Sequence, residues 1–233
     1  MDYDDGVDPR ALILSNTTID TPHLCPEIRL HLITETCPLW KAGERELANL
    51  RLPDPFWGFC WAGGQALARY ILDHPAWVRG RRVLDLGAGG GVEAIAAAKS
   101  GASWVLAADT DPLAAEAVRL NADLNQVSLD TTTADLVGGD CRGFDVLLAG
   151  DMCYDPDFCA GLIPWLRRLA RQRVVVLLGD PLRGFMPTTG MEVLASYQTP
   201  ADVDLRGEHL RPARVVLLKE LDPESTGLHR TAV

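Results

Sequence analysis

The segment Arg82-Val83-Leu84-Asp85-Leu86-Gly87-Ala88-Gly89-Gly90-Gly91-Val92-Glu93 decides how the rest of the chain is interpreted. A short apolar run comes first, Asp85 stands just before the first glycine, and an alanine-rich run over 92–100 follows the loop. This order predicts a buried strand, a tight glycine turn and a helix, since glycine lets the backbone turn sharply and a ligand approach closely. We expect the carboxylate of Asp85 to lie at the end of the strand and to face a ligand crevice.

Apolar and amphipathic segments alternate after this loop and predict an α/β sheet. Because β and α segments alternate, the strands are expected to run parallel, with helices covering both faces. The last two strands have no helical segment between them, which predicts a closing hairpin and one antiparallel edge. The predicted fold class is therefore a seven-stranded, Rossmann-like α/β sheet with an antiparallel terminal strand. The expected strands cover 83–86, 104–109, 129–133, 144–149, 173–178, 191–197 and 214–219, and the expected helices 92–100, 112–125 and 157–171.

The first 50 residues are expected to form an extension with one helix, before the sheet domain over 51–233. Residues 1–20 are polar and acidic and predict a loose arm or a short edge element. Apolar residues at 28, 32 and 33, with Pro26 near the start, predict a helix over 26–34 that ends at Cys37-Pro38. His31 falls in this predicted helix, where a solvated or capping histidine is expected rather than a catalytic one.

Composition and charge restrict the expected partners. The 233 residues carry a formal net charge of −10 and a sequence pI of about 4.9. Nucleic-acid binding needs Lys and Arg clustered against phosphates, so a protein or a small molecule is the expected partner. No apolar run approaches the ~20 residues of a membrane span, and the acidic start resembles neither a secretory signal nor a mitochondrial presequence. We expect a cytoplasmic monomer that binds neither nucleic acid nor membrane.

Cysteine spacing gives no sign of a metal site. The six cysteines include no C-x-x-C pair and nothing that resembles a zinc knuckle. Free thiols in a reducing compartment, buried or partly buried, are the simpler expectation. The cysteines stand at positions 25, 37, 60, 141, 153 and 159.

Acidic residues follow four consecutive predicted strands. The carboxyl ends of the strands in a doubly wound sheet border the ligand crevice, so these side chains are expected to line one site together with Gly87. Asp109 comes 24 residues after Asp85, the place of a carboxylate that binds ribose hydroxyls. Asp111 precedes Pro112 and is expected to cap the next helix instead. The four acids are Asp85, Asp109, Asp135 and Asp151, of which Asp135 is placed to accept a hydrogen bond from an adenine amino group.

An aromatic, glycine-rich segment over 54–65 leads into a predicted helix over 66–73. Its Trp and Phe side chains either pack in the core or form a wall beside a ligand. The glycine pair that follows favours a backbone shaped around a ligand, but both interpretations stay open on the sequence alone. The residues concerned are Phe56, Trp57, Phe59 and Trp61, followed by Gly63 and Gly64.

The glycine loop fits more than one nucleoside cofactor. The spacing Gly89-x-Gly91-x-x-Ala94 satisfies a permissive dinucleotide pattern, so a nicotinamide-dependent oxidoreductase, or a nucleotide-binding module without activity, is one alternative. The acid that leads the loop favours another cofactor, because a carboxylate repels a pyrophosphate and attracts a cation. S-adenosylmethionine carries both a sulfonium and an amine, and it is the cofactor we expect.

The acid-first loop Asp85-x-Gly87-x-Gly89-x-Gly91 resembles motif I of the seven-strand methyltransferases, and the closing hairpin agrees with their class I sheet. Asp151-x-x-Tyr154 and the aromatic segment over 55–67 resemble the Asp-x-x-Tyr protein lysine methyltransferases. Within this group, the segments 25–34 and 179–181 resemble the electron transfer flavoprotein beta subunit lysine methyltransferases, in their bacterial form. The resemblance extends from about residue 20 to about residue 220. One departure is the triple glycine, where relatives often carry Gly-x-Gly-Cys or Gly-x-Gly-Thr.

This resemblance implies a protein-lysine N-methyltransferase whose substrate is the electron transfer flavoprotein beta subunit. It implies that Asp151 and Tyr154 face the incoming lysine. A methyltransferase that acts on another protein, for instance a ribosomal one, or on a small molecule remains the alternative. The implied contacts of S-adenosylmethionine are Trp61, Gly64, Asp85, Gly87, Gly89, Gly91, Asp109 and Asp135.

A lysine ammonium, with a pKa of about 10.4, must lose a proton before its nitrogen attacks a methyl group. Burial disfavours the ammonium, whereas a carboxylate at Asp151 favours it. Our hypothesis is that Asp151 mainly captures and orients the ammonium, that the proton leaves to water, and that alignment supplies most of the rate. The structural alternatives are a helix cap for Asp151 and a packed ring for Tyr154. Arg183 either meets an acidic partner surface or is solvated, and the sequence favours neither.

Overall fold

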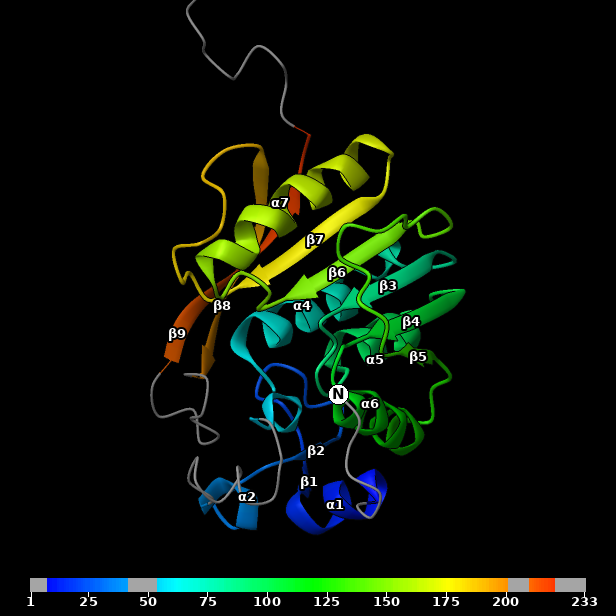
Figure 1. The fold of residues 1–233 in the computed structure, drawn as a ribbon, viewed down its shortest axis with the longest axis vertical. Helices are drawn as coiled ribbons and strands as arrows, with labels where there is room; N and C mark the ends of the chain where they lie inside the picture. The colour runs from blue at the N-terminus through cyan, green and yellow to red at the C-terminus, as the bar shows by residue number, and fades with distance from the viewer. Residues whose placement is uncertain (1–7, 42–53, 201–209, 221–233) are drawn as a thin grey trace, which may run out of the picture.

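A mostly parallel, seven-stranded sheet forms the centre of the protein (Figure 1). The computed structural model describes residues 8–41, 54–200 and 210–220. The strands lie in the order β5-β4-β3-β6-β7-β9-β8, so the chain enters the sheet at β3 and builds outward first to one side and then to the other. The five parallel strands are β3 (Arg82–Leu86), β4 (Trp104–Ala108), β5 (Asp130–Thr132), β6 (Val146–Gly150) and β7 (Val175–Asp180).

The predicted parallel strands are confirmed to within two residues at each end. The central strands β3 and β6 are buried over almost their whole length, which is typical of parallel strands covered by helices on both faces. They pair in register, with Asp85 opposite Leu148. The strand order reverses between β3 and β6, and the ligand crevice of a doubly wound sheet opens at such a point.

The two C-terminal strands form the predicted antiparallel hairpin at the edge of the sheet, but their order in the sheet differs from the one expected. β9 (Leu210–Leu218) lies between β7 and β8 (Met191–Pro200) and runs antiparallel to both. The edge strand β8 therefore points in the same direction as the five parallel strands, and the expected antiparallel edge is wrong. Burial explains this order, because β9 buries Val215 and Leu218 whereas β8 leaves Val193 and most of its other residues partly exposed. The antiparallel strand is still the last in the chain, as expected.

Helices cover both faces of the sheet, as predicted (Figure 1). α4 (Ala62–Asp73) and α5 (Val92–Lys99) share one hydrophobic core with one face, and α7 (Pro156–Arg171) shares another core with the opposite face. α6 (Pro112–Asn125) adjoins α5. Both α6 and α7 begin with an aspartate cap followed by proline, a combination that fixes the first turn. The prediction that Asp111 caps α6 is confirmed, since its Oδ1 accepts the Leu113 N–H at 2.8 Å.

The predicted helix over 26–34 is wrong. Strand β2 (Leu30–Leu32) occupies this segment and pairs antiparallel with β1 (Thr18–Asp20). Leu30 and Leu32 are buried while His31 is only half-buried, so the segment follows the two-residue period of a strand. Cys37 does not end a helix but precedes α2 (Pro38–Lys41).

Residues 1–20 were expected to form a loose arm or a short edge element. In the described part of this region, 8–20, most residues belong to helix α1 (Pro9–Asn16) or to β1. The predicted helix over 66–73 begins earlier, at Ala62, after the short 3-10 helix η1 (Phe56–Gly58); a second one, η2 (Pro75–Trp77), follows it. The proposed boundary at residue 50, like residues 1–7 of the arm, lies outside the described residues. The division into extension and domain stays a prediction.

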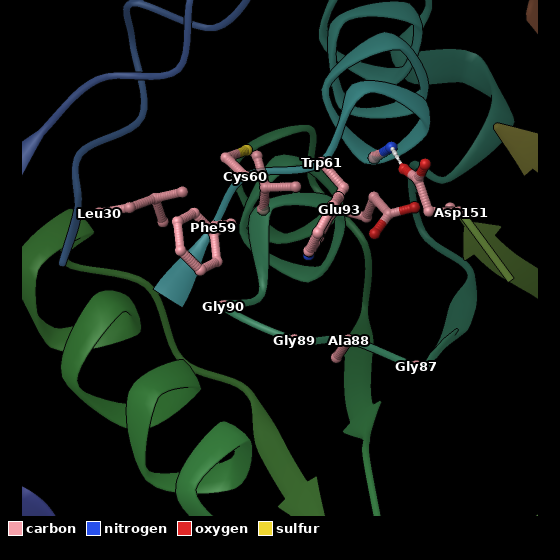
Figure 2. Close-up of a pocket in the computed structure, with 13 residues that line it drawn as sticks. Leu30, Phe59, Cys60, Trp61, Gly87, Ala88, Gly89, Gly90, Glu93 and Asp151 are labelled. Carbon is pink, nitrogen blue, oxygen red and sulfur yellow. Dashed lines mark hydrogen bonds between the residues drawn. The ribbon is translucent and has the colours of Figure 1, made fainter. Parts of the chain in front are cut away.

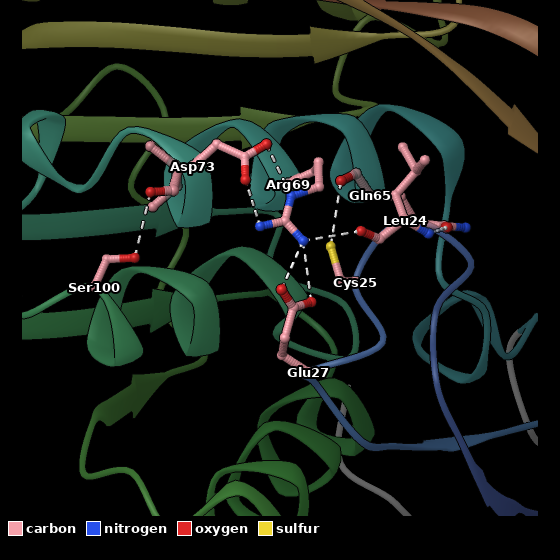
Figure 3. Close-up of polar contacts among 8 residues, drawn as sticks. Leu24, Cys25, Glu27, Gln65, Arg69, Asp73 and Ser100 are labelled. Carbon is pink, nitrogen blue, oxygen red and sulfur yellow. Dashed lines mark hydrogen bonds and ion pairs between the residues drawn. The ribbon is translucent and has the colours of Figure 1, made fainter.

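The N-terminal segment is fixed against the helices of the sheet. Ile13 of α1 and Ile33 share a buried core with Leu113 of α6. Further along, Arg69 of α4 donates hydrogen bonds to the carboxylate of Glu27 at 2.8 and 3.0 Å and to the carbonyl of Leu24 at 3.3 Å (Figure 3). These contacts keep β2 beside the carboxyl ends of the parallel strands, where it reaches the site described next.

Candidate functional site

A pocket opens at the carboxyl ends of β3 and β6, where the strand order reverses (Figure 2). Three segments that are far apart in the sequence converge on it: the start of α4 with the aromatic residues before it, the glycine loop after β3, and the residues at the end of β6. Leu30 of β2 closes one side. The position is the one that the strand pattern predicted. The lining residues from the three segments are Phe59, Cys60, Trp61, Gly64, Gly87, Ala88, Gly89, Gly90, Gly150 and Asp151.

The glycine loop turns sharply through left-handed backbone conformations. Gly87 and Gly89 have φ values of 70° and 52°, and Gly91, which caps α5, has 82°. A Cβ on Gly87 would collide with the Sδ of Met152, so glycine is required there for space as well as for backbone conformation. Gly87 and Gly89 line the pocket, whereas Gly91 does not, and a Cβ on Gly91 would lie 3.0 Å from Val118.

Asp85 lies beneath the loop and is fully buried. Its Oδ2 accepts the N–H of Ala94 at 2.9 Å and so supports the first turn of α5. Its Oδ1 has no hydrogen-bond partner among the residues that the structure describes. Burial raises the pKa of Asp85 to about 7. The buried, unpaired oxygen is available to a cationic ligand, but a direct contact with the cofactor stays a prediction.

Asp109 follows β4 and binds the glycine loop from the side. Its Oδ2 accepts the Gly89 N–H at 2.8 Å and its Oδ1 accepts the Asp111 N–H at 3.0 Å. Burial raises the pKa of Asp109, and these two hydrogen bonds oppose that shift. The carboxylate thus fixes the loop, and the ribose contact expected of it stays a prediction.

Asp135 lies apart from the pocket. Its side chain is exposed, its Oδ1 accepts the Val137 N–H at 2.9 Å, and it is absent from the residues that line the pocket. The structure brings Asp85, Asp109 and Asp151 to the ends of three adjacent strands, but it does not bring Asp135 into contact with them. The adenine contact expected of Asp135 stays a prediction.

Asp151 is the acidic residue that lines the pocket after β6. It has a left-handed φ of 57°. Its Oδ2 accepts the Gly64 N–H at 2.8 Å, in the first turn of α4, and its Oδ1 accepts a hydrogen bond of 2.6 Å from Arg183. The cap of α7 is Asp155, so Asp151 does not cap the helix that follows it. It instead joins α4, β6 and the segment after β7, and Arg183 is neither simply solvated nor directed away from the site.

Tyr154 lies outside the pocket. The residue is 58% exposed, and its ring stacks on Phe158 with ring centroids 5.6 Å apart. This arrangement resembles the packed-ring alternative, although the ring covers Phe158 on the surface and not in the core. Partial burial raises the pKa of Tyr154, so its hydroxyl is neutral at physiological pH. Its expected role in facing the lysine stays a prediction.

The aromatic segment divides between the two interpretations that the sequence left open. Phe59 and Trp61 line the pocket as a wall, and the Nε1 of Trp61 donates to the carbonyl of Phe56 at 2.9 Å. Trp57 is buried in the core with α6, and the ring of Phe56 is 62% exposed. Gly64 and Trp61 line the pocket, and the cofactor contacts expected of them stay a prediction.

Sequence reasoning missed two buried polar residues at the site. Glu93 of α5 lines the pocket and is 3% exposed, and its pKa is held well above the usual range, first by burial and then by Asp85 and Asp151. Asn121 of α6 lies behind the loop, where it donates to the Gly90 carbonyl at 2.8 Å and accepts the His31 N–H at 2.7 Å. Glu93 stood in the quoted motif, and an acid inside an alanine-rich helix was an available signal; nothing local marked Asn121.

Other features of the described residues bear on the site less directly. All six cysteines are buried free thiols, as expected. No group of three or more metal-ligating side chains occurs within residues 8–41, 54–200 and 210–220. None of the helices in those ranges is long and apolar enough to cross a membrane.

Comparisons with known proteins agree with this geometry. The family model of the ribosomal protein L11 methyltransferase (PrmA) matches residues 67–150, which include the glycine loop. The electron transfer flavoprotein beta subunit lysine methyltransferase of Xenopus laevis is 47% identical over 177 residues, or 75% of this chain and 71% of that protein. The Danio rerio protein of the same name is 41% identical over 203 residues, or 84% of this chain and 78% of that protein.

A solved structure supports the fold. A protein from Pyrococcus horikoshii, provisionally described as an RNA methyltransferase, aligns with a TM-score of 0.51 and 16% identity, and the alignment covers 72% of this chain and 90% of that one. The likeness concerns the class I methyltransferase sheet alone. The relatives in sequence, in contrast, align with three quarters of this chain or more.

Proposed function

The chain belongs to the family of the electron transfer flavoprotein beta subunit lysine methyltransferases, and from this premise we propose that it transfers a methyl group from S-adenosylmethionine to lysine side chains of that subunit. The observation that carries the proposal is the pocket in which the glycine loop and Asp151 meet. A methyl donor on the loop and a lysine at Asp151 would be neighbours there.

The residues present suit S-adenosylmethionine. The loop leaves its pocket side open at Gly89, where a Cβ would have no neighbour closer than 4.0 Å. Asp85 beneath the loop offers a buried oxygen with no hydrogen-bond partner in the described part of the chain. Carboxyl groups around the pocket attract a cationic cofactor and repel a pyrophosphate, which disfavours the nicotinamide alternative. The cofactor would be held by Trp61, Gly64, Gly87 and Gly89. Asp85 and Gly91 would support the loop. Asp109 would bind the ribose, and Asp135 would bind the adenine.

Asp151 would receive the lysine side chain. Its carboxylate is largely buried but keeps access to the pocket, where Phe59 and Trp61 provide an apolar wall. Arg183 already compensates the charge of Asp151. A lysine ammonium would therefore either share the Asp151 carboxylate with the guanidinium or displace the guanidinium from it. Because Arg183 competes for the carboxylate, Asp151 stabilises the charged form of the lysine less strongly, which favours loss of the proton to water. Tyr154, which is exposed three residues after Asp151, would contact the substrate chain as it docks.

S-adenosylmethionine, when bound, would supply a methyl group on a sulfonium: a neutral lysine nitrogen would form the N–C bond as the S–C bond breaks, and the thioether would leave with the electron pair. The protein aligns the nitrogen and excludes competing water. The residues around the pocket contribute orientation, and alignment of this kind supplies a large share of a transfer rate.

The substrate is the part of the proposal that depends on the relatives. The L11 methyltransferase model matches only residues 67–150, the cofactor-binding half of the sheet, and does not extend to Arg183 or to the N-terminal segment. The flavoprotein methyltransferases match over three quarters of this chain or more. The beta subunit is therefore the first substrate to test, and ribosomal protein is the second.

The test is incubation of the purified protein with methyl-labelled S-adenosylmethionine and electron transfer flavoprotein, followed by mass mapping of both subunits. The expected result is label on beta-subunit lysines that is lost with Asp151→Asn. If S-adenosylmethionine binds but neither subunit is labelled, the proposed substrate is wrong and ribosomal protein is tested in the same assay. If nicotinamide dinucleotides raise the unfolding temperature and S-adenosylmethionine does not, the methyltransferase proposal itself is wrong.

A further inference from the structure

Glu93 lines the pocket and has one buried carboxyl oxygen without a hydrogen-bond partner among the described residues. The residue lies in the first turn of α5 and lines the pocket although it is almost fully buried. By hydrogen-bond geometry its Oε1 has no partner among the residues that the structure describes, although the backbone N–H of Gly150 lies close enough to lower the pKa of the carboxyl group. Leaving a buried acceptor without a donor costs free energy, so a polar group that the protein itself does not supply is expected at this oxygen.

Two glycines shape the space around this carboxyl group. A Cβ on Gly150, at the end of β6, would collide with the Oε1 of Glu93, and a Cβ on Gly64 would lie 3.5 Å from its Oε2. Gly64 also donates its N–H to Asp151. Glu93 and Asp151 are therefore neighbours across one glycine, and Figure 2 shows both carboxyl groups on the same side of the pocket.

The two carboxyl groups differ in what they have left to offer a ligand. Asp151 is engaged at both oxygens, by Arg183 and by the Gly64 N–H. Glu93 still has Oε1 to offer. A hydrogen-bond donor that enters this end of the pocket would find its acceptor on Glu93, and a cationic donor would also be attracted by the neighbouring charge of Asp151.

We propose that Glu93 binds a primary ammonium group at this end of the pocket. The inference rests on the proposed function, which brings two such groups to the pocket: the amino group of S-adenosylmethionine and the side chain of the target lysine. Burial, followed by the nearby Asp85 and Asp151, raises the pKa of Glu93, the Gly150 N–H lowers it, and a cation bound beside the carboxyl group would favour the ionised form. The other ionisable groups that face it, Cys25 and Cys60, are thiols whose own pKa values are raised by burial, so they stay neutral.

The experiment compares Glu93→Gln with wild type and with a control variant, Glu192→Gln. Glu192 forms an exposed ion pair with Lys219, far from any role proposed for Glu93. Binding constants are measured by calorimetry for S-adenosylhomocysteine and for methylthioadenosine, which lacks the amino-acid part of the cofactor. The KM is measured for the flavoprotein substrate. Glu93→Met, which removes the buried polar group while keeping its volume, repeats the measurements if Glu93→Gln does not fold.

Two results support the proposal and identify the ammonium. If it belongs to the cofactor, the variant binds S-adenosylhomocysteine at least tenfold more weakly and methylthioadenosine within twofold of wild type. If it belongs to the lysine, both nucleosides bind normally and the KM for the protein rises at least tenfold.

Other results overturn it. One such result is unchanged binding and KM, and another is equally weakened binding of both nucleosides. Either would show that Glu93 has only a structural role, provided that the wild type and Glu192→Gln still bind cofactor and methylate the substrate. If the wild-type protein itself binds no S-adenosylhomocysteine, the proposed function fails, and the inference fails with it.

Discussion

The guanidinium of Arg183 lies 2.6 Å from the Oδ1 of Asp151, so the acid at the centre of the pocket already has a cationic partner within the chain. Both side chains are mostly buried, at 22% and 11% exposure, which shields the pair from solvent screening. Arg183 belongs to the segment after β7, whose start is fixed by the hydrogen bond of 2.6 Å that Asp180 accepts from the Leu182 N–H. A positively charged substrate side chain must compete with this pair.

Arg183→Met tests that competition. Removal of the guanidinium takes away one cation that competes with the lysine ammonium for Asp151, so we expect the KM for the protein substrate to fall about 3- to 10-fold, the equivalent of about 1 kcal/mol. Steady-state kinetics with electron transfer flavoprotein measure this. Arg142→Met removes a pair with Asp140 on the surface and is expected to leave KM unchanged. A rise in KM with Arg183→Met would mean that the arginine positions Asp151 and does not compete with the substrate.

Asp151→Asn is expected to lose most of the turnover while S-adenosylmethionine still binds. Asparagine keeps an acceptor for the Gly64 N–H but no longer attracts an ammonium. Turnover is measured with labelled cofactor, and cofactor affinity by calorimetry. Asp145→Asn is the matched control, since Asp145 accepts the Arg82 N–H just before β6, at the other end of the strand. If cofactor binding were lost in parallel with turnover, the assignment of Asp151 to the lysine site would be wrong.

Gly87→Ala is expected to destabilise the protein more than Gly80→Ala. Both glycines have a φ of 70°, so both variants carry the strain of a left-handed alanine, about 1–3 kcal/mol. Only at Gly87 would the new Cβ collide with another side chain, that of Met152, because the surroundings of Gly80 are open. Urea unfolding measures the difference, and we also expect weaker S-adenosylmethionine binding for Gly87→Ala. Equal destabilisation would show that Met152 moves aside without cost.

Asn121→Leu is expected to lower the free energy of unfolding by about 2–4 kcal/mol, because it leaves two buried backbone groups without their partner. These groups are the Gly90 carbonyl and the His31 N–H. Since Asn121 joins β2 to the glycine loop, cofactor affinity should fall as well. Asn125→Leu, one turn further along α6, removes bonds to Arg29 at a more exposed position and should cost less. Similar losses for the two variants would contradict the importance of the loop contact.

Stability is expected to depend on pH through Asp85. Its pKa is raised to about 7 in the folded protein, against about 3.9 in an unfolded chain, so the folded state binds more protons between these values. The free energy of unfolding should therefore fall as the pH rises from about 4 to about 7, and Glu93 adds a contribution of the same sign. Asp85→Asn should flatten this dependence and be relatively more stable near pH 8. Urea unfolding at a series of pH values measures it, and parallel curves for the two proteins would contradict the expectation.

Much of the fold followed from local patterns. The glycine loop, the Asp-Pro helix starts and the apolar strands are signals carried by neighbouring residues, and each predicted strand of the parallel sheet formed where its pattern lay. The failures had non-local causes. The segment around Leu30 was expected to be a helix because its period was counted at 28, 32 and 33, whereas pairing with β1 and contact with Asn121 select a strand. The position of β9 inside the sheet depended on which of two strands had more apolar surface to cover.

The sequence alone determined the class of sheet, the acid-first loop and the acid after β6, because each depends on residues a few positions apart. The tertiary structure decided where each acid lies: Asp85, Asp109 and Asp151 are at the ends of adjacent strands, with Asp151 lining the pocket, and Asp135 is exposed. It also decided that Arg183 pairs with Asp151 across 32 residues and that Glu93 faces the same glycine as Asp151. The physical reason is that charge, burial and hydrogen bonding act through space, and the distances in space are set only when the strands have taken their order in the sheet.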